Sequence, residues 1–411
     1  MRGLDMKDQA VTLFQSEKEV IAYAQGIIPQ LGSAEQLICT EIGDGNLNFV
    51  YRVKNAMTGA SVIIKQAGDF ARSTQDYKLT IDRNRIEAEV IRYYGTLTPA
   101  LVPKVYHYDA DKHCYLMEDL GDYEIFRKAL LKREINSVFS DQIATFLANV
   151  LLKTSCIGMK PMQKREMEKR YANPELCKIS EDLVFTDPFT DVGGTNRVFE
   201  PNRDYVEREV YGDTELRLEA AKLKSRYLNQ SEALIHGDLH TGSIFARPDS
   251  IKVIDPEFAF YGPAGYDVGN VVGNLAFAYI NAAVTMDDGV KKKTFLTWLD
   301  QTIGEVIDLF CEKFLQGFAK ETTDVMMRTD GFAEWYLAGV LSDTAGIAGL
   351  EMLRRTVGEA GVEEIRGIDD VQQRCCAERY AIQIGKRLVK ERNALNCGAD
   401  YRRVLAEVLQ Q

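Results

Sequence analysis

Two apolar runs that each end in carboxylates constrain the fold of this chain more than any other feature. The first run leads into Asp238, and the second leads into Asp255 and Glu257. Residues 247–250 lie between the runs and have the composition of a tight turn, so the segment is predicted to form a β-hairpin. An isolated Asp after a strand is most often a solvated turn residue. Three carboxylates at one hairpin, with histidines and glycines beside them, favour a chemical role instead.

The register of this hairpin decides which side chains meet. Pairing Ala246 with Ile251 brings Ser243 to the end of the hairpin that carries Asp255, and Asp238 in the preceding loop then approaches the same point. Such an arrangement suits phosphoryl transfer, in which one acid accepts a hydroxyl proton and others bind Mg²⁺ against nucleotide phosphates. The sequence therefore predicts a kinase-type site here.

Each residue of this site has a predicted role. Asp238 is predicted to be the base or orienting acid that takes the substrate's hydroxyl proton. Asp255 and Glu257 are the predicted Mg²⁺ ligands, because this ion prefers hard oxygen donors. His236 is predicted to support the loop through hydrogen bonds, and the role of His240 stays open.

A lysine at the end of an apolar strand is the candidate phosphate contact. Lys65 follows such a strand, and alone it would be a solvated residue. Glu87 lies in the next predicted helix and supplies the partner carboxylate that a kinase lysine needs, whereas Glu89 points to another face. Residues 43–48 contain two glycines and are able to cover phosphates with backbone N–H groups, although an ordinary hairpin has the same composition.

The hydrophobic patterns differ between the two parts of the chain. Extended runs separated by turns, and one helix over residues 82–94, predict a small antiparallel sheet with a helix. The runs cover residues 37–42, 48–53, 61–65, 104–108 and 114–117. After Gly121 the pattern becomes helical, and Ser140 is predicted to cap one of the helices. We expect an α+β fold with an N-terminal lobe over residues 1–119 and a larger, mostly helical lobe over residues 120–411.

Composition excludes several classes of protein. The net charge of −11 leaves no basic excess for a nucleic-acid partner. The eight scattered cysteines form no Cys-x-x-Cys pair, which argues against a zinc or disulfide framework and favours reduced thiols in the cytoplasm. Residues 1–10 lack the apolar core of a signal peptide. Asparagines interrupt the apolar run 268–284, so we expect a buried helix rather than a membrane span.

Several motifs resemble the methylthioribose kinase family, which belongs to the aminoglycoside and choline kinase group with its protein-kinase-like fold. The motifs are residues 43–48, 65–67, 117–120, 236–243, 255–263, 265–270 and 351–358. Most of them are shared widely among kinases. The Thr241-Gly242-Ser243 ending and the Arg354-Arg355 pair are more particular to this family.

The resemblance implies transfer of the ATP γ-phosphoryl group to the 1-hydroxyl of S-methyl-5-thio-D-ribose, a step of methionine salvage. It also implies a homodimer, whose interface the sequence does not locate. The residues that it implies for the sugar are Asp238, Arg354 and Arg355. The residues that it implies for Mg·ATP, together with the lysine's partner Glu87, are Asn48, Lys65, Glu118, Asp119, Leu120, Asp255, Pro256 and Glu257.

Two departures from related sequences stand out. Ser243 occupies the position where kinases of the wider group carry an Asn, so Glu257 is the predicted second metal ligand. Residues 73–78 replace the Gly-Glu-Ser-Trp-Pro run of the family, which changes the flap over the nucleotide.

Other interpretations stay open. The chain could phosphorylate an aminoglycoside, choline or another sugar, or could be a non-catalytic nucleotide-binding module. An aminoglycoside needs a strongly acidic pocket, whereas the Arg354-Arg355 pair suits a neutral sugar that gains a phosphate. Without the resemblance, that pair would be a solvated helix face or a salt bridge to Glu351. Trp335, Tyr336 and the loop over residues 185–199 are alternative walls for the methylthio group.

Overall fold

The computed structural model describes residues 13–43, 48–68 and 80–410, and the chain forms two compact units. The first unit comprises residues 1–99 and 103–121, and the second comprises residues 100–102 and 122–411. The predicted boundary after Asp119 lies two residues before this division, and residues 100–102 join the second unit. Residues 44–47 of the predicted phosphate loop, and the flap residues 73–78, lie outside the described residues.

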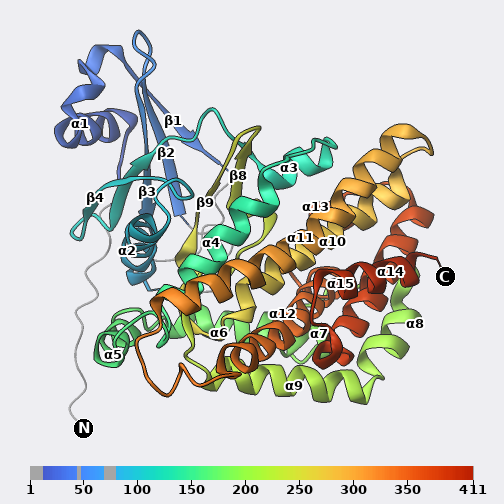
Figure 1. The fold of residues 1–411 in the computed structure, drawn as a ribbon. Coiled ribbons are helices and arrows are strands. Elements are labelled where there is room, and N and C mark those ends of the chain that lie inside the picture. The colour runs from blue at the N-terminus through green and yellow to red at the C-terminus, as the bar shows by residue number, and fades with distance from the viewer. Residues whose placement is uncertain (1–12, 44–47, 69–79, 411) are drawn as a thin grey trace. The chain divides into compact units, whose positions relative to one another are not determined.

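The first unit is built on a five-stranded antiparallel sheet with the strand order β1-β2-β3-β5-β4 (Figure 1). Its strands are β1 (Leu37–Ile42), β2 (Asn48–Asn55), β3 (Ser61–Ala67), β4 (Val105–Asp109) and β5 (Cys114–Glu118). Every strand predicted from the sequence is present, and its ends lie within two residues of the prediction. The sheet therefore follows from the extended runs and the turns between them.

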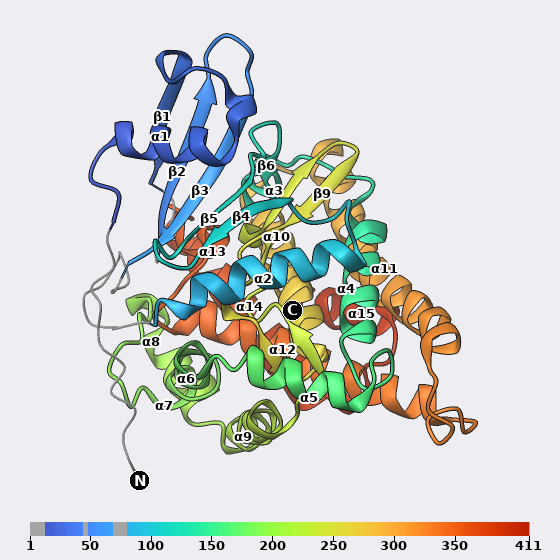
Figure 2. The ribbon, with the colours of Figure 1, turned by 90° about the vertical axis from the view of Figure 1, so that its left-hand side faces the viewer.

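Two helices, α1 (Glu17–Ile27) and α2 (Asp82–Leu97), cover the sheet (Figure 2). Val62 and Ile64 of β3 join a buried apolar cluster with Val20 of α1. Lys65 is the next residue along β3, and its ammonium contacts Glu87 of α2. Because successive side chains of a strand point to opposite faces, α1 and α2 lie on opposite sides of β3. This alternation is what turns a polar side chain towards α2.

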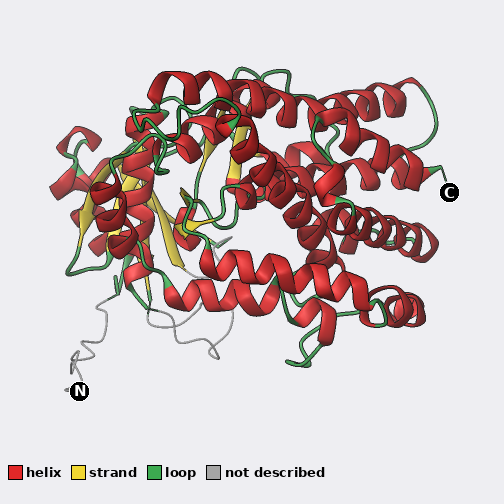
Figure 3. Ribbon diagram, turned by 60° about the horizontal axis from the view of Figure 1, so that its bottom comes forward, coloured by secondary structure: helices red, strands yellow, loops and turns green. Residues whose placement is uncertain are grey.

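The second unit is mostly helical, as Figure 3 shows. Its helices are α3 (Phe126–Leu131), α4 (Phe139–Lys153), α5 (Pro161–Arg170), α6 (Pro174–Leu183), α7 (Asp187–Thr190), α8 (Arg203–Val206), α9 (Thr214–Asn229), α10 (Gly265–Thr285), α11 (Val290–Glu321), α12 (Phe332–Val357), α13 (Glu363–Arg366), α14 (Val371–Lys390) and α15 (Gly398–Leu409). The prediction that Ser140 caps a helix is wrong. Helix α4 begins at Phe139, one residue before Ser140, and the Ser140 hydroxyl donates to Glu305 at 2.7 Å.

Helices α10 and α12 form the central packed pair of this unit. Gly265, Gly269 and Gly273 form one stripe of α10, and a Cβ on any of them would lie within 3.0 Å of the α12 backbone. The missing side chains let the two helices approach closely. Among the described helices only α10 is long and apolar enough to cross a membrane, and 78% of that stretch is buried inside the protein, as expected for a core helix.

Short strands in the second unit carry the loops of interest. Strand β7 (Ala233–Ile235) pairs with β10 (Phe260–Gly262), and β8 (Ile244–Arg247) pairs with both β6 (Glu124–Ile125) and β9 (Ser250–Val253). Ala246 lies opposite Ile251, and the Ile254 N–H donates to the Ser243 carbonyl at 3.0 Å. The hairpin and its register are therefore as predicted.

Candidate active site

A buried aspartate at the start of α10 holds the loop that follows β7. The Asp267 carboxylate accepts the backbone N–H groups of His236 at 2.7 Å and Gly237 at 3.0 Å. Gly237 has φ +83°, and a Cβ there would lie 2.3 Å from the Phe258 carbonyl oxygen. Only glycine fits this left-handed, crowded position. The loop that presents Asp238 is thus fixed by its backbone.

His236 supports the same loop from inside, as predicted. Its Nε2 bonds to the Ile254 carbonyl oxygen at 2.7 Å, and its Nδ1 accepts the Asp238 N–H at 3.3 Å. These partners assign the proton of the neutral ring to Nε2. Burial lowers the pKa of His236, so the ring is neutral. His236 therefore links the loop to the second strand of the hairpin without offering a proton to a substrate.

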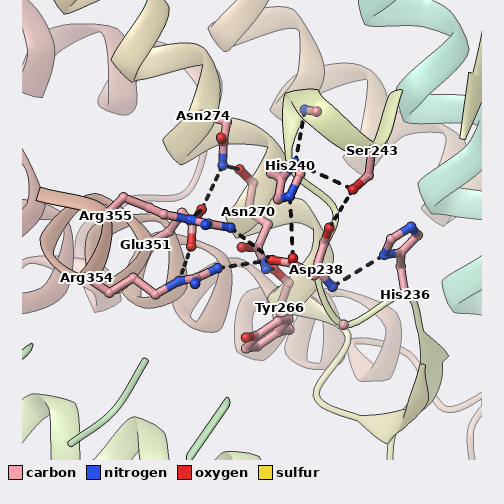
Figure 4. Close-up of polar contacts among 12 residues, drawn as sticks. His236, Asp238, His240, Ser243, Tyr266, Asn270, Asn274, Glu351, Arg354 and Arg355 are labelled. Atoms are coloured by element: carbon pink, nitrogen blue, oxygen red, sulfur yellow. Dashed lines mark hydrogen bonds and ion pairs between the residues drawn. The ribbon is translucent and has the colours of Figure 1, made fainter. Parts of the chain in front are cut away.

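The Asp238 carboxylate lies between a histidine and two arginines (Figure 4). Its Oδ1 accepts from Nη2 of Arg354 at 3.0 Å and Nη2 of Arg355 at 3.2 Å, and its Oδ2 lies 3.4 Å from Nε2 of His240. The Gly242 N–H donates to His240 Nδ1 at 2.9 Å, which leaves the ring proton on Nε2, facing Asp238. The side chain of Asp238 is 26% exposed, so a ligand can reach it.

These neighbours keep Asp238 ionised. Burial by itself would raise its pKa, but His240 and the guanidinium groups of Arg355 and Arg354 outweigh burial and hold the pKa well below its usual range. Burial also lowers the pKa of His240, so this ring is a neutral hydrogen-bond donor.

Glu351 is the buried anchor of the two arginines. It accepts from Arg354 Nε at 2.5 Å, from Arg355 Nε at 3.0 Å and from Asn274 Nδ2 at 2.9 Å. The two arginines are buried, so they are not a solvated helix face. Each of them contacts Glu351 through Nε and Asp238 through Nη2. The salt bridge to Glu351 and the approach to Asp238 are therefore two parts of one network.

The other two carboxylates lie in the turn after β9. Asp255 adopts φ +61°, and Glu257 belongs to the short 3-10 turn Pro256–Phe258. Asn173, which sequence reasoning missed, donates from Nδ2 to the carbonyls of Glu257 at 2.8 Å and Ala259 at 3.2 Å. A left-handed non-glycine residue costs about 1–2 kcal/mol, and such strain concentrates at functional sites.

Asp255 and Glu257 by themselves would supply only part of the coordination shell of a Mg²⁺ ion. Within the described part of the chain no group of three or more His, Cys, Asp or Glu side chains could hold a metal. Mg²⁺ commonly takes one or two protein carboxylates and completes its shell with water and substrate phosphates. The donor set Asp255 and Glu257 suits that mode.

In the first unit, Lys65 and Glu87 form a buried ion pair. Their Nζ–Oε1 distance is 2.6 Å, and both side chains are less than 10% exposed. Glu89 instead pairs with Arg85 at 2.9 Å. The predicted choice of partner is confirmed, and the contact of Lys65 with ATP stays a prediction.

The other residues predicted to bind ATP divide between the units. Asn48 begins β2 and accepts from Arg83 at 3.3 Å, while Glu118 ends β5 and leads into Asp119 and the buried Leu120. Pro256 belongs to the second unit with its neighbouring carboxylates. Each unit is defined by itself, so the meeting of these residues at one nucleotide stays a prediction.

The alternative walls predicted for the methylthio group lie at different distances from Arg354. Arg354 is nineteen residues after Trp335 in α12, which separates them by roughly 28 Å along the helix. The loop over residues 185–199 lies at the correct end, since the Arg197 N–H donates to the Val357 carbonyl at 3.0 Å. Trp335 and Tyr336 are therefore too far along α12 to line a site at Arg354.

Sequence reasoning missed the residues that hold the site together. Asp267 and Asn274 contact residues of the site but had no predicted role, and Glu351 was considered only as a salt-bridge partner of the two arginines. A signal was present, because polar residues in the apolar run 268–284 need partners inside a core. Asn274 is such a residue, and its partner is Glu351.

Known proteins resemble this chain over most of its length. Residues 38–290 match the phosphotransferase enzyme family. The chain is 38% identical over 390 residues to methylthioribose kinase from Geobacillus sp. (strain WCH70), covering 95% of this chain and 94% of that protein. It is 40% identical over 375 residues to methylthioribose kinase from Geobacillus kaustophilus (strain HTA426), covering 91% and 92%.

A solved structure shares the fold. Choline kinase from Cryptosporidium parvum Iowa II matches with a TM-score of 0.50 and 13% identity, over 96% of this chain and 97% of that chain. At this identity the likeness concerns the fold alone. The predicted α+β, protein-kinase-like fold class is confirmed.

Proposed function

This chain belongs to the methylthioribose kinase family and to the phosphotransferase enzyme family, and we propose on that premise that it phosphorylates S-methyl-5-thio-D-ribose. The reaction transfers the γ-phosphoryl group of ATP to the 1-hydroxyl and gives S-methyl-5-thio-α-D-ribose 1-phosphate. Its place is methionine salvage. Identity of 38% to 40% over nine-tenths of the chain supports this assignment.

The observation that carries the proposal is the environment of Asp238. Its partly exposed carboxylate is ionised, and its position is fixed by His240, Arg354 and Arg355. A carboxylate with a low pKa is a weak base. In a loose phosphoryl-transfer reaction the hydroxyl proton leaves late, so Asp238 orients the 1-hydroxyl first and accepts its proton as the new P–O bond forms. The two guanidinium groups are also suitable donors to the sugar oxygens.

The residues proposed for Mg·ATP are taken for each unit by itself. In the first unit, Lys65, positioned by Glu87, is the proposed phosphate contact, Asn48 is a further proposed ATP contact, and the connector Glu118–Leu120 is proposed for the adenine. Asp255 and Glu257 would hold the Mg²⁺ of Mg·ATP, and that ion supplies charge neutralisation to the phosphates. We also propose a homodimer in the cytoplasm; the eight free cysteines support a reducing compartment.

Acceptor-dependent ATP consumption tests this function. We expect consumption with methylthioribose, and little with choline, an aminoglycoside or no acceptor. Asp238→Asn should lower kcat by about 10²-fold or more, because a positioned base contributes 10²–10⁴. Asp287→Asn, at an exposed position, is the matched control, and thermal melting checks that each variant is folded.

Two outcomes would overturn the proposal. Equal consumption with choline or an aminoglycoside would favour another alcohol kinase. A folded Asp238→Asn variant with an unchanged rate would remove the role assigned to this carboxylate.

A further inference from the structure

The arginines that contact Asp238 have no net charge to offer a phosphoryl group. Arg354 and Arg355 bind two carboxylates, Asp238 and Glu351, through the same pair of guanidinium groups. Both carboxylates are ionised, since the pKa of Asp238 is well below its usual range and that of Glu351 is about 2. Two positive and two negative charges balance in this network. A transferred phosphoryl group therefore gains no net positive charge from Arg354 and Arg355.

A third guanidinium group lies on the other side of the network. Arg127 of α3 donates from Nη2 to the Asn274 oxygen at 3.2 Å, and Asn274 in turn donates to Glu351. Its side chain is 18% exposed. Nη1 has no hydrogen-bond partner within residues 13–43, 48–68 and 80–410. It is also absent from the buried polar atoms that lack a partner, so Nη1 is accessible to solvent. This edge of the guanidinium is free to bind a ligand.

Arg127 is directed towards the Asp238 loop. A Cβ built on Gly242 would lie 3.1 Å from Arg127 Nη1 and 2.8 Å from Cε1 of His240. His240 itself lies 3.4 Å from the Asp238 carboxylate, and the charge of Arg127 helps to lower the pKa of His240. The absence of a side chain at Gly242 thus leaves room for Nη1 beside the histidine.

The counter-ion of Arg127 neutralises it poorly. The Glu364 carboxylate is fully buried, and its Oε1 lies 3.4 Å from Arg127 Nε. Neither oxygen of Glu364 has a hydrogen bond among the residues that the structure describes. Burial raises the pKa of this carboxyl group. Glu351, by contrast, accepts three hydrogen bonds, so the two buried carboxylates compensate their arginines very differently.

We propose that Arg127 contacts the phosphoryl group as it reaches the acceptor, and the phosphate of the sugar 1-phosphate product, with Glu364 as the buried residue that positions it. The inference rests on the proposed function. The guanidinium fork suits phosphate oxygens, and hydrogen bonds from charged donors are about twice as strong as neutral ones. Arg354 and Arg355 then hold Asp238 and the sugar, and Arg127 supplies the charge that favours phosphate.

Binding of the neutral substrate and the anionic product separates this role from a structural one. Calorimetry without nucleotide would compare methylthioribose, its 1-phosphate and inorganic phosphate on the wild type, Arg127→Gln and Arg127→Lys. We expect Arg127→Gln to raise the Kd of the 1-phosphate about 10- to 100-fold, because a charged hydrogen bond contributes about 1.5–3 kcal/mol. The Kd of methylthioribose should change less than 3-fold. Arg127→Lys should recover part of the loss.

Controls distinguish the possible failures. Arg217→Gln removes an exposed arginine of α9 and should change neither ligand. If Arg127→Gln weakens sugar and sugar phosphate equally, or leaves the Kd of both the 1-phosphate and inorganic phosphate unchanged, the inference is wrong. If instead the wild type consumes no ATP with methylthioribose, the proposed function fails, and the inorganic phosphate comparison still decides whether Arg127 binds phosphate.

Discussion

Replacing Glu351 by Gln should destabilise the second unit by about 3 kcal/mol. The buried carboxylate accepts hydrogen bonds from Arg354, Arg355 and Asn274, and Gln keeps the volume but only one acceptor oxygen. Removing one partner of a buried ion pair costs about 3–5 kcal/mol, because the remaining charge stays buried.

The pKa of Glu351 leads to the same magnitude. Burial alone would raise it, but the charges of Arg354 and Arg355 lower it from 4.5 to about 2. Each pKa unit corresponds to about 1.4 kcal/mol, so ionisation of this group stabilises the fold by about 3 kcal/mol. Since the folded pKa is depressed, this contribution is fully present above pH 4.5 and is lost as the pH falls towards 2.

Urea unfolding followed by tryptophan fluorescence measures this change in the right unit. The chain has two tryptophans, Trp298 and Trp335, and both belong to the second unit. Glu166→Gln, at an exposed position, is the control and should change the unfolding free energy by less than about 0.5 kcal/mol. A loss below about 1 kcal/mol for Glu351→Gln would refute the reasoning, because it would mean that water or other groups replace the carboxylate.

Two further predictions concern the loop before Asp238. Gly237→Ala should lower the unfolding free energy by about 3 kcal/mol or more, since its Cβ would clash with the Phe258 carbonyl. Gly331 has a similar φ but open space around it, so Gly331→Ala should lower the unfolding free energy by only about 1 kcal/mol. Equal losses for the two variants in urea titrations would contradict the clash. Burial depresses the pKa of His236 below its usual value of 6.5, so stability should fall as the pH drops below 6.5. His236→Gln should flatten this dependence, and a flat wild-type curve would contradict the prediction.

Local patterns in the sequence were sufficient for the sheet and the hairpin. Extended runs separated by turns predicted all five strands of the first unit, and the turn at residues 247–250 predicted the pairing of Ala246 with Ile251. The choice of Glu87 over Glu89 followed from helix periodicity. Each of these results depends on residues that are close in sequence or on the regular spacing of side chains along a strand or helix.

The residues that were missed depend on contacts across the fold. Asn173 meets Glu257, and Arg127 meets Glu364, over separations of 84 residues and more than 200 residues. No period or motif marks such pairs. The failed cap at Ser140 has a similar cause, because its hydroxyl bonds to Glu305 on a different helix. Local preference predicted a cap, and a tertiary partner prevailed.

The close packing of α10 and α12 explains why so many buried charges meet in one place. The glycine stripe of α10 brings its backbone against α12, so that Asp267 and Asn274 on one helix and Glu351 on the other lie at the same site. Asp267 then fixes the backbone before Asp238, and Glu351 fixes the arginines that bind its carboxylate. A bulky residue in the stripe would separate the helices and so disconnect the aspartate from its arginines. Helix packing, rather than the loop alone, sets the acidity of Asp238.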